Sequence, residues 1–182
     1  SITEAVPELI DRTIMVNGVA KTYAMTGWRL GWMTGPLDAM KAAGNLQSHL
    51  TSNVSNISQR AAIAALTGPQ DAVAEMREAF DRRRKVAVAE LSKIHGWVAP
   101  MPEGAFYVFP NIAGCLGKTT KGGKKIETDT DFALALLEEK YVAAVQGAAY
   151  GMSPYLRISY ATDTDSLREA CERIQEFCRE LA

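Results

Sequence analysis

A short apolar stretch followed by glycines and cations most constrains what this chain can fold into. The stretch Thr13–Val16 predicts a buried strand, and Asn17-Gly18 predicts a turn directly after it. Lys21 follows, just beyond a strand end, where open α/β sheets bind their ligands. A lysine amine in such a place can form a covalent bond with a carbonyl group.

A single arginine, Arg29, follows Lys21 by eight residues and is flanked by Gly27 and Gly31. Glycines let the backbone approach a neighbouring group closely, and a guanidinium binds a phosphate or carboxylate through paired hydrogen bonds. The residue types therefore predict a site with one nucleophile and one anion-binding group. A surface lysine and a helix-capping arginine are the alternative interpretation of the same spacing.

The run from Lys21 to Gly31 reads Lys-Thr-Tyr-Ala-Met-Thr-Gly-Trp-Arg-Leu-Gly. It resembles the lysine signature of class I (fold type I) aminotransferases of the aspartate aminotransferase type, which use pyridoxal 5′-phosphate (PLP). The resemblance implies that Lys21 is the catalytic Schiff-base lysine and that Arg29 binds the cofactor phosphate. Many family members carry a serine where this chain has Gly18 or Ala20, so a phosphate-binding hydroxyl must come from elsewhere.

Three further segments resemble parts of the same family. Pro154–Ala161 resembles the strand whose arginine, here Arg157, binds the substrate α-carboxylate; an edge-strand arginine facing water is the alternative. Thr51–Gln59 resembles the loop that reaches the cofactor phosphate of the neighbouring subunit, which implies a homodimer and a cofactor contact by Ser52. A loop with helix caps is the alternative there. Pro102–Phe109 resembles a small-domain strand beside the active site.

Periodicity and the resemblance together predict an α/β protein with an α+β small domain. Residues 1–70 are expected to form the C-terminal part of the large PLP-binding domain, 71–95 an interdomain helix, and 96–182 the small C-terminal domain. The expected strands are Ile14–Val16, Trp28–Met33, Phe106–Phe109, Val142–Val145 and one around Arg157, and the expected helices are one starting at Pro36, Ile57–Leu66, Asp71–His95, Asp131–Lys140 and Asp165–Leu181.

The stretch Gly114–Lys125 contains Gly-Lys-Thr without the glycine spacing of a P-loop, and is expected to be a mobile surface loop. The net charge of −1 and the lack of a long apolar run argue against nucleic-acid and membrane partners. His49 and His95 are isolated, so no metal site is expected. Cys171 and Cys178 lie on one predicted helical face, as reduced core residues of a cytoplasmic protein.

The leading functional prediction is an enzyme, a PLP-dependent aminotransferase that acts on an amino acid and a 2-oxo acid, of the aspartate/2-oxoglutarate type. The family's phosphate-binding turn, ring-stacking aromatic residue and pyridine-binding aspartate have no counterpart here, so the chain is expected to be a C-terminal portion. A PLP lyase or synthase of the same fold is one alternative. A non-catalytic, aminotransferase-like sensing domain of a transcription regulator is the other.

Overall fold

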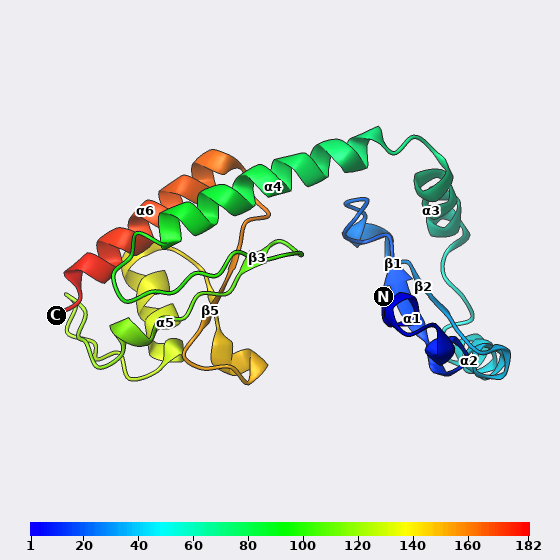
Figure 1. Cartoon of the computed structure of the whole chain (residues 1–182), viewed down its shortest axis with the longest axis horizontal. Helices are drawn as coiled ribbons and strands as arrows, with labels where there is room; N and C mark the ends of the chain where they lie inside the picture. The colour runs from blue at the N-terminus through cyan, green and yellow to red at the C-terminus, as the bar shows by residue number, and fades with distance from the viewer. The chain divides into compact units, whose positions relative to one another are not determined.

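The computed structural model describes all residues, Ser1–Ala182, and they form two compact units, Ser1–Glu75 and Met76–Ala182. Figure 1 shows that both units mix helices and strands, in agreement with the predicted α/β class. The boundary between the units falls inside the helix α4 (Asp71–Leu91). The assignment of these units to a large and a small domain stays a prediction. None of the helices has the length and apolar character needed to cross a membrane.

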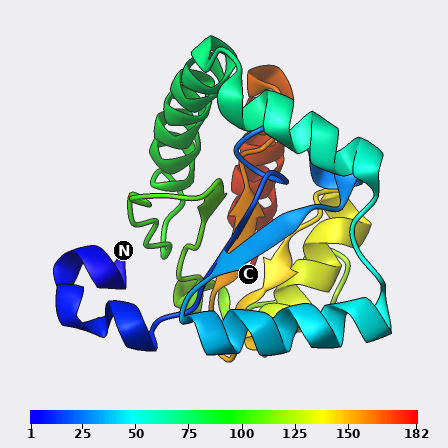
Figure 2. The ribbon, with the colours of Figure 1, turned by 90° about the vertical axis from the view of Figure 1, so that its right-hand side faces the viewer.

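The first unit contains an antiparallel strand pair, β1 (Met15–Gly18) and β2 (Gly31–Thr34), which run side by side in Figure 2. Gly18 pairs with Gly31, and a Cβ atom on Gly31 would lie 2.9 Å from the carbonyl oxygen of Asn17. The other elements of this unit are α1 (Ile2–Ala5), η1 (Pro7–Arg12), η2 (Thr26–Trp28), α2 (Leu37–Leu50) and α3 (Asn56–Thr67).

Three predictions about these strands are wrong. The turn predicted at residues 17–18 belongs to β1, because close pairing with β2 requires glycine there. The strand predicted over residues 28–33 begins only at Gly31, because η2 occupies Thr26–Trp28 and Arg29 follows in the left-handed conformation. The predicted burial of β1 is also wrong for this chain: β2 is its only strand partner, and Val16 is 75% exposed.

The helices of the first unit agree with the sequence pattern. The helix α2 begins directly after Pro36, and α3 covers the predicted Ile57–Leu66 with small extensions at both ends. The long helix α4 ends at Leu91, four residues before the predicted end at His95. The amides of Lys93 and Ile94 bond to carbonyl groups three residues earlier, and this tighter pattern ends the α-helix.

The second unit contains a three-stranded antiparallel sheet in the order β3 (Tyr107–Val108), β5 (Leu156–Ser159), β4 (Val145–Gln146). All three strands were expected, but β4 begins only at Val145, the last residue of the predicted strand Val142–Val145. The capping box of Thr128 and Asp131 starts α5 two residues earlier than predicted. The elements are the C-terminal part of α4, β3 (Tyr107–Val108), η3 (Ala113–Cys115), α5 (Asp129–Lys140), β4 (Val145–Gln146), η4 (Gly147–Tyr150), β5 (Leu156–Ser159) and α6 (Thr164–Glu180).

The core of the second unit lies between its sheet and its helices. The helix α6 lies beside α4 in Figure 1, and the amide nitrogen of Gln175 donates a hydrogen bond to the carbonyl oxygen of Glu90 (3.1 Å). The apolar face predicted for α6 is confirmed, with Phe177 added to it and Cys178 at its half-buried margin. The fully buried large side chains of this core include Leu91, Ile112, Phe132, Leu136, Leu156, Tyr160, Ile174 and Phe177.

The segment Gly114–Lys125 is built into this unit, contrary to its interpretation as a surface loop. Thr120 is buried, and its hydroxyl donates a hydrogen bond to a carboxylate oxygen of Glu139 on α5 (2.7 Å). The backbone of Thr119 exchanges two hydrogen bonds with Ala182 at the chain end (2.8 and 3.0 Å). These are contacts between residues far apart in sequence, so local composition alone could not reveal them.

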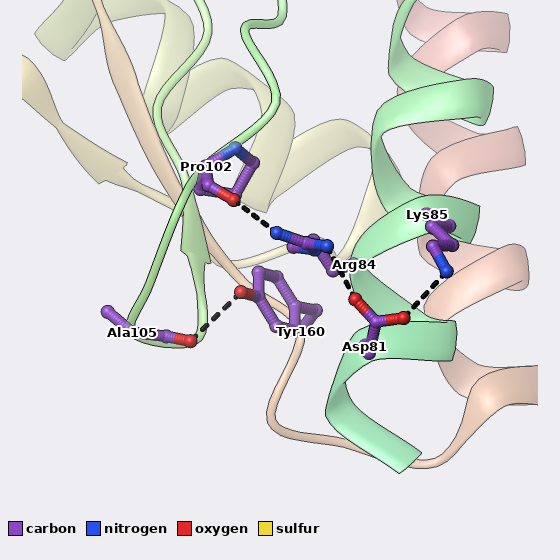
Figure 3. A network of polar contacts seen from close by, with 6 residues as sticks. All are labelled: Asp81, Arg84, Lys85, Pro102, Ala105 and Tyr160. Carbon is purple, nitrogen blue, oxygen red and sulfur yellow. Dashed lines mark hydrogen bonds and ion pairs between the residues drawn. The ribbon is translucent and has the colours of Figure 1, made fainter. Parts of the chain in front are cut away.

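A polar network fastens the loop before β3 to α4 and to the residue after β5 (Figure 3). The guanidinium of Arg84 donates to the carbonyl oxygen of Pro102 (2.8 Å) and to a carboxylate oxygen of Asp81 (2.5 Å). The buried hydroxyl of Tyr160 donates to the carbonyl oxygen of Ala105 (2.9 Å). The hydrogen bond with Lys85, together with the charge of Arg84, lowers the pKa of Asp81 below its usual value.

The contact of Tyr160 should contribute measurably to stability. We expect Tyr160→Phe to lower the free energy of unfolding by about 1 kcal/mol, because the buried ring remains while its part-buried hydrogen bond to Ala105 is lost. Chemical denaturation measures this difference. Tyr141→Phe is the matched control, since Tyr141 is 80% exposed and should tolerate the change. Equal effects of the two substitutions would contradict a specific role for the Tyr160 hydroxyl.

Candidate active site

The segment that joins β1 to β2 carries two of the predicted site residues, Lys21 and Arg29. Lys21 lies in a turn in which the amide of Tyr23 bonds to the carbonyl oxygen of Val19 (3.3 Å) and that of Ala24 to Lys21 (3.1 Å). The hydroxyl of Tyr23 bonds to the side-chain oxygen of Gln70, just before α4 (3.1 Å). The lysine side chain is exposed at the surface of the unit. The turn therefore presents the amine directly after the end of β1.

Arg29 lies at the other end of the same segment in a left-handed backbone conformation, with φ 52° and ψ 48°. Residues other than glycine adopt this conformation rarely, and it is often found at functional sites. One guanidinium nitrogen donates to the carbonyl oxygen of Thr26 (3.0 Å), which holds the side chain against η2. The other N–H groups of Arg29 make no hydrogen bond or ion pair within the chain, so the exposed guanidinium can bind an anion.

Of the two glycines beside Arg29, Gly31 is required by the pairing of β1 with β2, and Gly27 has no close contact. The sequence suggested that Gly27 and Gly31 admit a bound group, but the close contact of Gly31 is with the backbone of Asn17 on β1. Gly27 has open space where a Cβ atom would lie. The anion-binding prediction therefore depends on the arginine, and Gly31 is explained by strand pairing.

Ser52 lies in the loop between α2 and α3, also in a left-handed conformation (φ 62°), and it is exposed. The amide of its neighbour Asn53 bonds to the carbonyl oxygen of Thr51 (2.8 Å). A hollow in the first unit is lined by β2, α2 and α3, and its lining includes Asn53 and Leu30. The segments that carry Ser52 and Arg29 therefore border the same hollow.

Arg157 belongs to the second unit and lies on β5, the central strand of the sheet. Its guanidinium carbon lies 4.5 Å from the ring centre of Tyr107 and 4.9 Å from that of Tyr150. No carboxylate of the chain pairs with this half-buried cation. Two aromatic contacts fix the guanidinium while leaving its N–H groups available, and this arrangement suits recognition of a carboxylate.

The contacts of Tyr107 and Tyr150 with Arg157 were not predicted from the sequence. Tyr107 pairs with Ser159 across β3 and β5, which makes it a diagonal neighbour of Arg157. Tyr150 is contributed by η4 and also contacts the ring of Phe109, with ring centres 6.2 Å apart. The strand register would have revealed the first contact, but single-sequence patterns do not determine that register.

The η4 turn that carries Tyr150 is hydrogen-bonded to Asp129 at the start of α5. This buried carboxylate accepts a hydrogen bond from the backbone amide of Ala148 (3.0 Å). Its second oxygen has no partner. A buried acid that accepts from a backbone amide constrains the turn, so Asp129 helps to position Tyr150 beside Arg157.

The predicted residues thus fall into two groups. Lys21, Arg29 and Ser52 belong to the first unit, and Arg157 belongs to the second. Two features of the first group fit PLP: an exposed lysine for its aldehyde, and an arginine with available N–H groups for its phosphate. The geometry of Arg157 fits the carboxylate of a substrate.

Known aminotransferases resemble this chain over almost its whole length. The family model described as aminotransferase class I and II matches residues 3–174. The chain is 56% identical over 176 residues to the aspartate/prephenate aminotransferase of Cereibacter sphaeroides, covering 97% of this chain and 44% of that protein. It is 55% identical over 180 residues to the aspartate aminotransferase of Streptomyces avermitilis, covering 99% and 44%.

A crystal structure of an aspartate aminotransferase from Rhizobium meliloti resembles the chain with a TM-score of 0.96 and 50% sequence identity. That match covers 100% of this chain and 46% of the other. The chain therefore spans about 44% of the length of the curated relatives it matches.

Proposed function

This chain belongs to the class I and II aminotransferases, and on that premise we propose that it is part of a PLP-dependent enzyme that transfers an amino group from an amino acid to a 2-oxo acid. The observation that carries the proposal is the placement of Lys21 and Arg29 on one short segment between paired strands. This segment offers an amine and an anion-binding guanidinium in the order and spacing of the family signature.

The residues of the chain have distinct tasks in this proposal. Lys21 would hold the cofactor through its amine, and the same amine would move a proton to and from the reacting carbon as a general acid and base. Arg29 holds the phosphate and so fixes one end of the cofactor. The bound PLP supplies an electron sink for the carbanion that forms at the substrate α-carbon.

Arg157 binds the substrate α-carboxylate through its planar guanidinium, which lies against the rings of Tyr107 and Tyr150. Because every α-amino acid and 2-oxo acid carries this carboxylate, Arg157 serves both halves of the reaction. Binding at a fixed fork also orients the α-carbon, which converts part of the binding energy into a lower barrier.

Aspartate is the proposed amino donor, because the names of the curated relatives share it. The acceptor is 2-oxoglutarate or, as the name of the Cereibacter sphaeroides relative suggests, prephenate. We further propose a homodimer in which Ser52 contacts the cofactor phosphate of the neighbouring subunit. A cytoplasmic location is proposed from the three unpaired cysteines.

The test is an assay of the intact protein with PLP, aspartate and either 2-oxoglutarate or prephenate. The proposal predicts formation of oxaloacetate together with glutamate or the aminated form of prephenate, in equal amounts. Release of ammonia, or loss of carbon dioxide or a side-chain group without amination of the acceptor, would instead indicate a lyase. Binding of amino acids without turnover would favour the sensing-domain alternative.

A further inference from the structure

Two cysteines that are 63 residues apart in the sequence meet in the second unit. The sulfur of Cys115, in η3, lies 4.0 Å from the sulfur of Cys178, near the end of α6. Cys115 is buried, whereas Cys178 is half-buried and reaches the surface. The third cysteine, Cys171, is buried on α6 and makes no contact with either sulfur that reaches hydrogen-bond distance.

The surroundings of Cys115 favour its thiolate. The indole N–H of Trp97 donates a hydrogen bond to the sulfur of Cys115 (3.2 Å). An indole N–H can donate but cannot accept. The hydrogen bond with Cys178, this indole and the charge of Lys118 lower the pKa of Cys115 below its usual value, although burial opposes the change. Burial instead raises the pKa of Cys171 to about 11.

We propose that Cys115 and Cys178 form an oxidisable thiol pair that closes to an intramolecular disulfide when the protein meets a peroxide. The pair lies wholly within the second unit and takes no part in the proposed amino-group transfer, so this inference is independent of that function. The disulfide would join η3 directly to α6.

The chemistry balances with peroxide as the oxidant. The Cys115 thiolate attacks one peroxide oxygen, the O–O bond breaks, and the departing hydroxide takes up a proton to leave as water. Cys178, losing its proton, then attacks the resulting sulfenic sulfur, and the displaced hydroxyl leaves as a second water. The two thiols lose two electrons and two protons in total, and the peroxide is reduced to two waters.

The required movement is small. A disulfide has a sulfur–sulfur distance of about 2.05 Å, so the two sulfurs must approach by about 2 Å from their present separation. Cys115 lies in a single 3-10 turn and Cys178 lies close to the end of α6, where side-chain rotation and a small backbone shift can supply this approach. The half-buried Cys178 marks the side from which a molecule as small as hydrogen peroxide reaches the pair.

The sequence allows a direct test, because trypsin separates the three cysteines. Cys115, Cys171 and Cys178 fall in the tryptic peptides 94–118, 169–173 and 174–179. The intact, folded protein is treated with hydrogen peroxide, its remaining thiols are alkylated, and the digest is analysed by mass spectrometry. We expect peptides 94–118 and 174–179 to be joined with a loss of about 2 Da, the two thiol hydrogens, and to separate again after reduction with dithiothreitol.

Variants identify the order of the steps. Cys178→Ser keeps a hydroxyl donor beside Cys115, so dimedone should trap a sulfenic acid on Cys115 in this variant, and Cys115→Ser should abolish the cross-link. Cys171→Ser is the matched control and should leave the cross-link unchanged. Protein unfolded in urea should lose the preference for the Cys115–Cys178 pair.

Three results would overturn the proposal. The first is a disulfide that involves peptide 169–173 in the folded protein. The second is a disulfide between molecules, and the third is full recovery of alkylated Cys115 and Cys178 after peroxide treatment. The first and third are read from the wild-type digest, and the second from the mass of the undigested wild-type protein under non-reducing conditions, so the test stands even where a variant folds poorly.

Discussion

Lys21→Ala is expected to reduce amino-group transfer by the intact protein by at least about 10²–10⁴-fold, the usual contribution of a positioned general acid and base. The true loss should be larger, because the same amine also holds the cofactor. Alanine can neither form the covalent link nor move a proton at the substrate α-carbon. The decrease should appear in kcat, measured as oxaloacetate formation from aspartate with saturating PLP and acceptor.

Lys41→Ala is the control for this prediction. Lys41 is exposed on α2 in the same unit, and no hydrogen bond or ion pair depends on its side chain. Its loss should leave kcat within a factor of two or so, as expected for a surface substitution. Equal losses in both variants, or retained turnover in Lys21→Ala, would remove Lys21 from the catalytic role.

Arg157→Lys should lower kcat/KM for the amino acid and for the 2-oxo acid alike. Loss of a paired, charged hydrogen-bonding fork costs about 2–5 kcal/mol. At 1.4 kcal/mol per factor of ten, this corresponds to a decrease of about 30- to 4,000-fold. Lysine keeps the positive charge, but its ammonium group lacks the planar guanidinium that lies against Tyr107 and Tyr150 and cannot bind a carboxylate in bidentate fashion.

The control for Arg157 is Arg173→Lys. Arg173 lies on the surface of α6, where it forms an ion pair with Glu169 one helical turn away (2.5 Å), and exposed pairs of this kind contribute little. Its substitution should leave kcat/KM for both substrates unchanged. An Arg157→Lys variant impaired toward only one of the two substrates would show that the arginine does not bind the carboxylate they share.

The candidate site residues that lie in short local segments could be proposed from the sequence alone. Lys21 and Arg29 occupy one connection between strands, and Arg157 lies in one short strand, so a linear motif is enough to locate them. Helix limits followed equally local signals, such as Pro36 before α2 and the periodic apolar face of α6. Their roles in binding and catalysis stay predictions.

Most of the features that the sequence did not reveal depend on tertiary contacts. The strand expected from Trp28 begins only at Gly31, because η2 and the left-handed Arg29 precede it; the remaining differences do involve distant residues. The two rings around Arg157 require the register of β3 and β5, and the buried position of Thr120 requires its contact with α5. The meeting of Cys115 and Cys178 could not be read from spacing, which had pointed only to the helical pair Cys171 and Cys178.

Borohydride reduction of the intact, PLP-loaded protein tests most directly whether Lys21 carries the cofactor. Reduction should fix a pyridoxyl group on Lys21 permanently. Because trypsin does not cleave after a modified lysine, the label should appear on a single peptide, residues 13–29, in place of the separate peptides 13–21 and 22–29. A pyridoxyl group found reproducibly on any other lysine, with peptides 13–21 and 22–29 recovered unmodified, would contradict the account.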